Sequence, residues 1–162
     1  MLSKKIRRLT LSGMLAALIA VFTAYVSCPI PGGYFHPGDA MIALSAIVLG
    51  PYAAIPAAIG SMLADLLVGY QHYAVFTFII KGLAGLVAGW GCAGGKLGLR
   101  SVISLLLGAL VIPAGYIVAD LCLGDMALVL ADLPWNGLQA AVFFLCGMIC
   151  LGTKLRKLTD RI

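Results

Sequence analysis

The chain has 162 residues, of which 62% are hydrophobic and 10% are charged, and its formal net charge is +5. Its mean hydropathy is +1.09, whereas roughly 25% of the residues of an ordinary globular domain are charged. Such a chain has too few polar residues to cover a water-soluble fold, so a soluble domain is excluded. Because a transmembrane helix needs about 20 mostly apolar residues, we expect residues 1–162 to form a single integral membrane domain, an all-α, polytopic bundle of short helices.

Six apolar segments follow one another along the chain, and we expect each to be a helix. The first follows a basic stretch but is longer than the apolar region of an ordinary signal peptide, which predicts a retained helix. The second has about 12 residues and is separated from the third by Gly50-Pro51, which leaves either a hairpin of two spans or one kinked helix. The six segments are Leu9 to Val26, Asp39 to Gly50, Tyr52 to Val68, Ala74 to Cys92, Ser101 to Asp120 and Pro134 to Gly152.

The basic residues favour the hairpin, because Lys and Arg in short loops stay on the cytoplasmic side of a membrane. With six spans, ten of the eleven basic residues fall on one side, whereas one kinked helix would divide them four and six. We therefore expect six transmembrane helices with the N and C termini in the cytoplasm of a multi-pass plasma-membrane protein. The ten residues are Lys4, Lys5, Arg7, Arg8, Lys96, Arg100, Lys154, Arg156, Lys157 and Arg161.

The first apolar segment carries small residues at a spacing of four, namely Ala16, Ala20 and Ala24, with Gly13 and Ala17 beside them. Residues four apart lie on one face of a helix, and small residues there let another transmembrane helix approach closely. The residues alone leave two interpretations open. The strip packs against helices of this chain, or it docks on a separate membrane subunit.

The loop from Cys28 to Asp39 is rich in Pro and Gly, which predicts a defined folded loop. It also carries Tyr34 and His36, and aromatic and ionisable side chains together are typical of a binding site rather than of a plain connection. Asp39, at its end, either caps the N-terminus of the second helix or belongs to the site.

Lys81 is the one basic residue that falls inside an expected span. A charge there costs about 2.5 to 3.5 kcal/mol on insertion scales, so it needs a partner or a polar cavity. Asp65 in the third segment lies at a compatible depth. Either the two form a structural ion pair, or Lys81 faces a ligand cavity.

Other polar and aromatic residues fall at the same expected outer face. Tyr116 lies late in the fifth segment, and Asn136 and Gln139 are three residues apart on one face of the sixth. The two amides could bind the edge of a heterocycle or hydrogen-bond to another helix. Membrane-interface anchoring is the expected role of the remaining aromatic residues, which are Tyr70, Tyr73 and Trp135.

The sequence carries no catalytic constellation. It has no Glu, no HExxH or P-loop motif and no Ser/His/Asp set of the kind a membrane hydrolase needs. Its five cysteines lack the spacing of a metal site. We therefore expect no enzyme activity, no cofactor and no metal site, so uphill transport by this chain must draw its energy from other proteins.

Four motifs, in this order and spacing, resemble one transporter family over nearly the whole length of the chain. The chain is similar to the substrate-binding S components of energy-coupling factor (ECF) transporters, in the branch related to riboflavin, pyridoxine and hydroxymethylpyrimidine carriers and a proposed queuosine-precursor carrier. The motifs are Pro29-Ile30-Pro31-Gly32-Gly33-Tyr34-Phe35-His36-Pro37-Gly38-Asp39-Ala40, Leu49-Gly50-Pro51, Ala64-Asp65-Leu66-Leu67-Val68-Gly69-Tyr70 and Phe76-Thr77-Phe78-Ile79-Ile80-Lys81-Gly82.

This resemblance implies a six-helix bundle of a prokaryotic ABC importer that captures a water-soluble vitamin or related heteroaromatic compound from outside. The first loop would be a lid and helices four to six the walls. Delivery would need a transmembrane coupling (T) subunit and two cytoplasmic ATPases, with Ala16 and Ala20 as the AxxxA docking motif. The first loop differs from that of riboflavin carriers, which favours a smaller ligand. The substrate-binding candidates are Tyr34, His36, Asp39, Lys81, Tyr116, Asn136 and Gln139.

Two other functions remain open at this point. The chain could be a structural or assembly subunit of a membrane complex that binds no ligand, or, with less support because the catalytic set is missing, a membrane enzyme.

Overall fold

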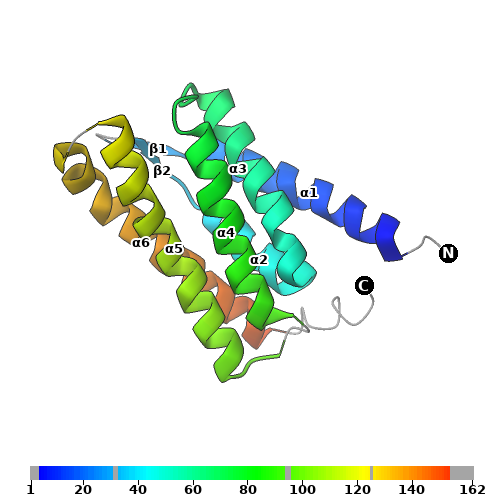
Figure 1. The fold of residues 1–162 in the computed structure, drawn as a ribbon. Coiled ribbons are helices and arrows are strands. Elements are labelled where there is room, and N and C mark those ends of the chain that lie inside the picture. The colour runs from blue at the N-terminus through cyan, green and yellow to red at the C-terminus, as the bar shows by residue number, and fades with distance from the viewer. Residues whose placement is uncertain (1–3, 31–32, 94–95, 125, 154–162) are drawn as a thin grey trace.

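The structure is a computed structural model that describes residues 4–30, 33–93, 96–124 and 126–153. In these ranges the chain forms a helical bundle with one short β-hairpin at one end (Figure 1). The elements are α1 (Lys4–Tyr25), β1 (Cys28–Ile30), β2 (Gly33–Phe35), α2 (Gly38–Leu49), the 3-10 turn η1 (Gly50–Ala53), α3 (Ala54–Val68), α4 (Ala74–Cys92), α5 (Leu99–Leu123) and α6 (Met126–Gly152).

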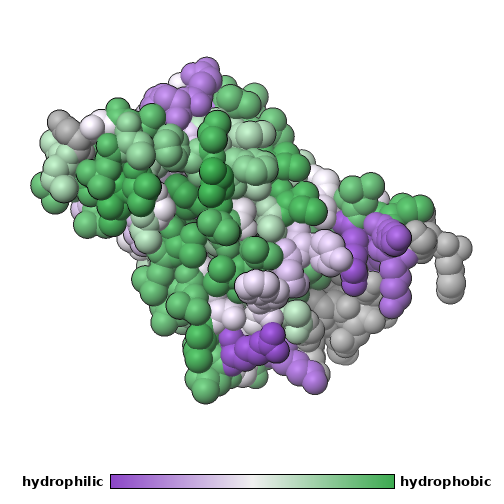
Figure 2. Space-filling model, viewed as in Figure 1, coloured by the Kyte–Doolittle hydropathy of each residue, from purple (hydrophilic) through white to green (hydrophobic). Residues whose placement is uncertain are grey.

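Five helical stretches are long and apolar enough to cross a membrane, with α2, η1 and α3 counted as one continuous stretch, Gly38–Val68. This confirms the predicted helical membrane bundle. Figure 2 shows how hydrophobic side chains cover the middle of one face, while hydrophilic side chains gather at its ends. A band of apolar surface between two polar ends is what a membrane-embedded protein requires.

The chain reverses direction at η1. Asp39 and Gly50 of the α2 region lie beside Lys81 and Gly89 of α4, so α2 runs parallel to α4. In contrast, a Cβ on Gly82 would lie 3.2 Å from the Cβ of Ala58, and one on Gly85 would lie 3.0 Å from the carbonyl oxygen of Ala53, so α3 runs antiparallel to α4. The helices α2 and α3 therefore run in opposite directions, and a separate membrane crossing by each of them stays a prediction.

Glycine permits the close approach at this reversal. A Cβ on Gly89 would collide with the carbonyl oxygen of Gly50, and Gly50 itself has a φ of +60°, a conformation that residues with a side chain rarely adopt. The turn is thus held against α4 by backbone contact.

The short helix α2 lies at the centre of the bundle, against α1, α4 and α6. Ile42, Ala43, Ala46 and Ile47 are all at most 1% exposed. Because α2 is covered by its neighbours, its 12 residues do not need to present a complete apolar surface to lipid.

Most observed helix bounds lie within a few residues of the expected ones, but α1 begins at Lys4 rather than at Leu9, and the start of α6 differs more. The helix α6 begins at Met126 rather than at Pro134, which lies inside it. Membrane helices tolerate internal proline because neighbouring helices and local adjustments satisfy the freed carbonyl. The loop after α1 is a folded loop as predicted, but it contains an antiparallel hairpin in which Pro29 pairs with Tyr34.

The small residues of α1 divide between two faces. Ala20 and Ala24 are buried, Ala16 is half-buried, and Gly13 and Ala17 are exposed. A Cβ on Gly60 of α3 would lie 2.5 Å from the carbonyl oxygen of Ala16, so the two helices are in close backbone contact there. Part of the strip therefore packs inside the subunit, and docking through it stays a prediction.

Candidate functional site

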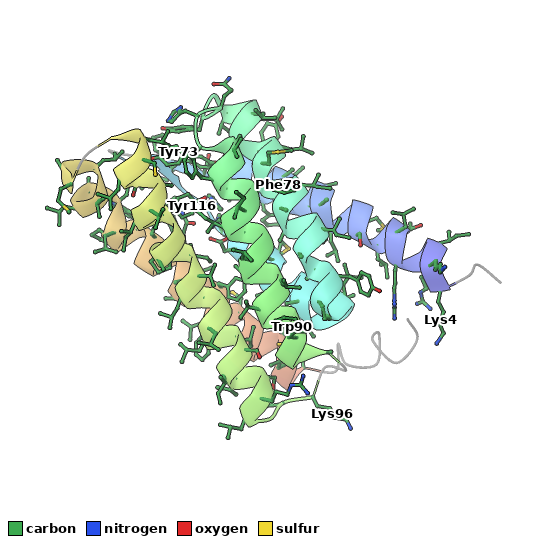
Figure 3. All side chains as sticks on the ribbon, viewed as in Figure 1. Lys4, Tyr73, Phe78, Trp90, Lys96 and Tyr116 are labelled. Atoms are coloured by element: carbon green, nitrogen blue, oxygen red, sulfur yellow. The ribbon has the colours of Figure 1, made fainter. Side chains whose placement is uncertain are left out.

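A cavity of about 40 Å³ lies where the β1–β2 hairpin meets the ends of α3, α4, α5 and α6. We call this the hairpin end of the bundle. Its opposite, the basic end, carries Lys4 and Lys96, which lie far from Tyr73 and Tyr116 in Figure 3. The cavity is lined by Ile30, Tyr34, His36, Asp65, Tyr70, Tyr73, Thr77, Tyr116, Asp132, Asn136 and Gln139.

Five of the seven predicted binding residues line this cavity. The structure brings them together from three separate parts of the chain, the hairpin region, α5 and α6. They are Tyr34, His36, Tyr116, Asn136 and Gln139.

The other two candidates, Lys81 and Asp39, are fully buried beside the cavity and form an ion pair. The Lys81 Nζ lies 2.8 Å from Asp39 Oδ1 and 2.9 Å from Asp39 Oδ2, and both side chains are 0% exposed. Lys81 thus pairs with Asp39 and not with Asp65. The capping role considered for Asp39 is wrong, because Pro37 is the N-cap of α2 and no side chain caps this helix.

Gln139 connects this ion pair to the cavity. Lys81 Nζ donates to Gln139 Oε1 at 3.0 Å, and Gln139 Nε2 donates to the carbonyl oxygen of Tyr34 at 3.4 Å. An ammonium group can only donate hydrogen bonds, so it fixes which end of the amide is the acceptor. The buried pair therefore orients a side chain that lines the cavity.

Tyrosines form much of the wall. The rings of Tyr34 and Tyr70 have centroids 5.1 Å apart. The rings of Tyr73 and Tyr116, both labelled in Figure 3, have centroids 6.2 Å apart and planes inclined by 56°. Tyr73 is 7% exposed, and its hydroxyl donates to Asp120 Oδ1 at 2.8 Å. Because it is buried in the wall, Tyr73 is not the interface anchor that its position in the sequence suggested.

Asp65, in the last turn of α3, contacts the hairpin. The Tyr34 hydroxyl donates to Asp65 Oδ1, while Asp65 Oδ2 is buried and accepts no hydrogen bond from the described part of the chain. Burial raises the pKa of Tyr34, and the Asp65 carboxylate raises it further. Tyr34 therefore stays a neutral donor at physiological pH.

His36 covers the cavity from the hairpin side and is 4% exposed. Burial lowers the pKa of His36 to about 4, with nearby Lys81 adding to the effect and Asp39 opposing it. The imidazole is consequently neutral at pH 7, with one nitrogen able to donate and the other able to accept a hydrogen bond. Its Nδ1 has no hydrogen-bond partner among the described residues.

The model of one protein family, described as ECF-type riboflavin transporter, S component, matches residues 3–157 of the chain. The chain belongs to this family. The S component shares its fold with a solved structure of the S component of a bacterial ECF transporter, with a TM-score of 0.73, 18% sequence identity and 98% of each chain covered. It is also 38% identical, over 102 residues, to an uncharacterized protein in the gap 3′ region of Pyrococcus woesei, a match that covers 61% of this chain and 68% of the relative.

Membership in this family makes the protein a substrate-binding membrane subunit for a vitamin-type compound, not an enzyme. A substrate-binding role explains why polar side chains lie together inside the otherwise apolar bundle of the S component. The described lining of the cavity is mostly polar and aromatic, with Ile30 as its one aliphatic side chain, and convergent polar groups of this kind fix the orientation of a bound ligand.

Sequence reasoning missed several lining residues of the S component. Helical spacing could have found some of them. Tyr73, which is the N-cap of α4, is followed at intervals of four by Thr77 and Lys81. In α6, Asp132 precedes Asn136 by four residues, and Asn136 precedes Gln139 by three. Residues at these spacings share one face of a helix. The missed residues are Ile30, Asp65, Tyr70, Tyr73, Thr77 and Asp132.

Proposed function

We propose that this S component binds a small, water-soluble heteroaromatic compound in the cavity beneath the β1–β2 hairpin and delivers it into the cell. The observation that carries the proposal is the convergence of the Asn136 and Gln139 side chains with tyrosine rings on one cavity. Amides can read the donor and acceptor pattern of a heterocycle edge, and tyrosine rings can stack on its face.

The cavity of about 40 Å³ is far smaller than the roughly 300 to 1,000 Å³ of a typical ligand pocket. Ligand entry therefore requires the hairpin to move away from the helix ends. Tyr34 and His36 contribute the hairpin side of the lining, so the hairpin is the proposed lid. The first loop, Cys28 to Asp39, differs from that of riboflavin carriers, and this difference favours a ligand of the pyridoxine, hydroxymethylpyrimidine or queuosine-precursor type over riboflavin.

We further propose six membrane crossings with both termini in the cytoplasm of a prokaryotic cell. The reversal at η1 supports this arrangement, as does the position of the basic residues: Arg8 of α1 lies over the ring of Tyr52 in η1, with its Cζ 5.1 Å from the ring centroid. The basic C-terminal residues lie outside the described part of the chain. Labelling of single cysteines should find positions near Lys96 protected from outside reagents and positions near His72 accessible, and the reverse result would refute the topology.

Transport would require a T subunit and two ATPases, because the chain carries no nucleotide-binding motif of its own. The proposed docking surface is the strip of small residues on α1 around Ala16 and Ala20. Its exposed members, Gly13 and Ala17, provide the surface that a helix of another subunit could approach closely.

Binding is tested with the isolated S component in detergent, by a thermal-shift screen of water-soluble vitamins and their precursors followed by calorimetric titration of the hits. Gln139→Leu should weaken binding of an identified ligand by roughly 5- to 150-fold, the range expected when one buried polar contact is lost. Leu138→Ala is the matched control, because Leu138 lies next to Gln139 but is 44% exposed. If no compound binds, the alternative of a ligand-free assembly subunit is favoured.

A further inference from the structure

The charge of the cavity lining is one-sided. Two of its side chains, Asp65 and Asp132, are carboxylates, and none of the described lining residues is Lys or Arg. Lys81, which lies nearby, is 0% exposed and is already held by Asp39 and Gln139. His36, with its lowered pKa of about 4, adds no positive charge at pH 7.

One oxygen of the Asp65 carboxylate lacks a hydrogen-bond donor among the described residues. Asp65 is 3% exposed, and the Tyr34 hydroxyl occupies Oδ1 only. Its Oδ2 is buried without a hydrogen-bond partner in the described part of the chain. Leaving a buried carboxylate oxygen without a donor is costly, so a ligand that supplies a donor at this position gains the energy of that unmade bond.

The surroundings of Asp65 also suit a cation. Tyr34 donates to it and stacks near Tyr70, with ring centroids 5.1 Å apart, and aromatic rings attract positive charge toward their faces. A neutral donor would satisfy Oδ2, but a protonated amine would in addition offset the buried negative charge, because charge-assisted hydrogen bonds are roughly twice as strong as neutral ones.

We propose, building on the proposed binding function, that the heteroaromatic ligand carries a protonated amino group that donates to Asp65 Oδ2, with Asp132 contributing further negative potential. The same arrangement discriminates against phosphorylated compounds, because their negative charge would be buried against two carboxylates without a basic side chain in the lining. The site thus selects amine-bearing heterocycles in their unphosphorylated form.

The test uses pairs of compounds that differ by an amine in place of a hydroxyl. Pyridoxamine is compared with pyridoxine, aminomethylpyrimidine with hydroxymethylpyrimidine, and aminomethyl-deazaguanine with hydroxymethyl-deazaguanine, each titrated into the purified S component at pH 7. On the ring system that fits the cavity, the amine should bind roughly 10-fold to 150-fold more tightly. Pyridoxal phosphate and riboflavin phosphate, the anionic probes, should not bind measurably.

Variants assign the preference to its side chain. Asp65→Asn retains an acceptor for the Tyr34 hydroxyl but removes the charge, so the preference for the amine should fall to within about 3-fold while the hydroxyl compound keeps its affinity. Asp120→Asn is the matched control, because Asp120 is also buried, at 1% exposed, and accepts from a tyrosine but does not line the cavity. Thermal stability confirms that each variant is folded, and the wild-type comparison stands even where a variant does not fold.

The two proposals fail in different ways. If a hydroxyl compound or riboflavin binds as tightly as or more tightly than the matching amine, the charge inference is wrong while the proposed binding function stands. A preference for the amine that survives Asp65→Asn would also overturn the assignment to Asp65, whatever the effect of Asp120→Asn. If none of the compounds binds, both proposals fall together.

Discussion

Lys81 of α4 and Asp39 of α2 form an ion pair in which neither side chain is exposed to solvent. The pair joins the short central helix α2 to the longer helix α4 and, through Gln139, to α6. A buried ion pair by itself is weak evidence for stability, because desolvation offsets its attraction. Its contact with Gln139 gives it a second role, which is to hold a cavity-lining amide in one orientation.

Breaking this pair from one side should destabilise the protein strongly. Lys81→Met leaves Asp39 buried without its counter-ion, which typically costs about 3 to 5 kcal/mol. Asp39→Asn should have a similar effect, since it leaves the Lys81 ammonium uncompensated. Thermal unfolding in detergent, monitored by intrinsic fluorescence, measures the loss of stability in each of the two variants.

The double variant Asp39→Asn/Lys81→Met supplies the control, because it removes both charges at once. The loss of unfolding free energy in the double variant should be smaller than the sum of the losses in the two single variants. The difference, which is the interaction energy of the pair, should be about 1 to 3 kcal/mol. Additive losses would contradict a coupled pair.

The stability of the hairpin end should depend on pH through His36. The pKa of His36 is lowered from the ordinary 6.5 to about 4 in the folded protein, so the imidazole takes up a proton less readily in the folded protein than in the unfolded chain. Above pH 6.5 the group is neutral in both states and its contribution is fully present. As the pH falls from 6.5 toward 4, the unfolded chain takes up a proton that the folded protein does not, and stability falls by about 3 kcal/mol at most.

Thermal unfolding of the wild type and of His36→Gln across this pH range isolates the effect. The variant should lose the part of the pH dependence between pH 6.5 and 4. His72→Gln, which replaces an exposed histidine, should retain it. Identical pH profiles for the wild type and His36→Gln would refute the assignment.

The sequence predicts features that depend on neighbouring residues better than contacts between residues that are far apart in the chain. Helix positions depend on local hydropathy, so α4 agrees with its predicted bounds, Ala74 to Cys92. Lys81 was correctly expected to need a partner, because burying a charge is costly in any fold. The identity of that partner was not predictable, since Asp39 is 42 residues away and reaches Lys81 only because α2 lies at the centre of the bundle. Tyr73 was misread for the same reason, because an interface anchor and a buried wall residue share the same position at a helix end.

Two glycines that share a helical environment should respond oppositely to the same substitution. Alanine is favoured over glycine in a helix by about 1 kcal/mol, and a Cβ on Gly13 would meet no atom within 4 Å. Gly13→Ala should therefore maintain or slightly raise thermal stability. A Cβ on Gly60 would lie 2.5 Å from the carbonyl oxygen of Ala16, so Gly60→Ala should separate α1 from α3 and cost about 1 to 3 kcal/mol. Equal effects of the two substitutions would show that α1 does not pack on α3 as described.

The proposed docking of α1 on a T subunit gives a prediction that separates internal from external packing. Ala17 is exposed, whereas Ala20 is 8% exposed and belongs to the interior. Ala17→Trp should leave the isolated S component folded and able to bind its ligand, because the new side chain points away from the bundle. It should nevertheless prevent co-purification with the T subunit and ATP-dependent uptake, because a bulky residue blocks close approach of another helix.

Ala20→Trp should instead lower thermal stability by about 1 to 3 kcal/mol or more, the usual cost of overfilling a packed interior, and Ala16→Trp should fall between the two because Ala16 is half-buried. Leu106→Trp on α5 controls for added bulk, since Leu106 is 46% exposed and lies outside the strip. Assembly and transport that persist in Ala17→Trp would exclude the exposed side of the strip as the docking surface. A loss of assembly confined to variants that also lose stability would mean that the strip serves internal packing alone.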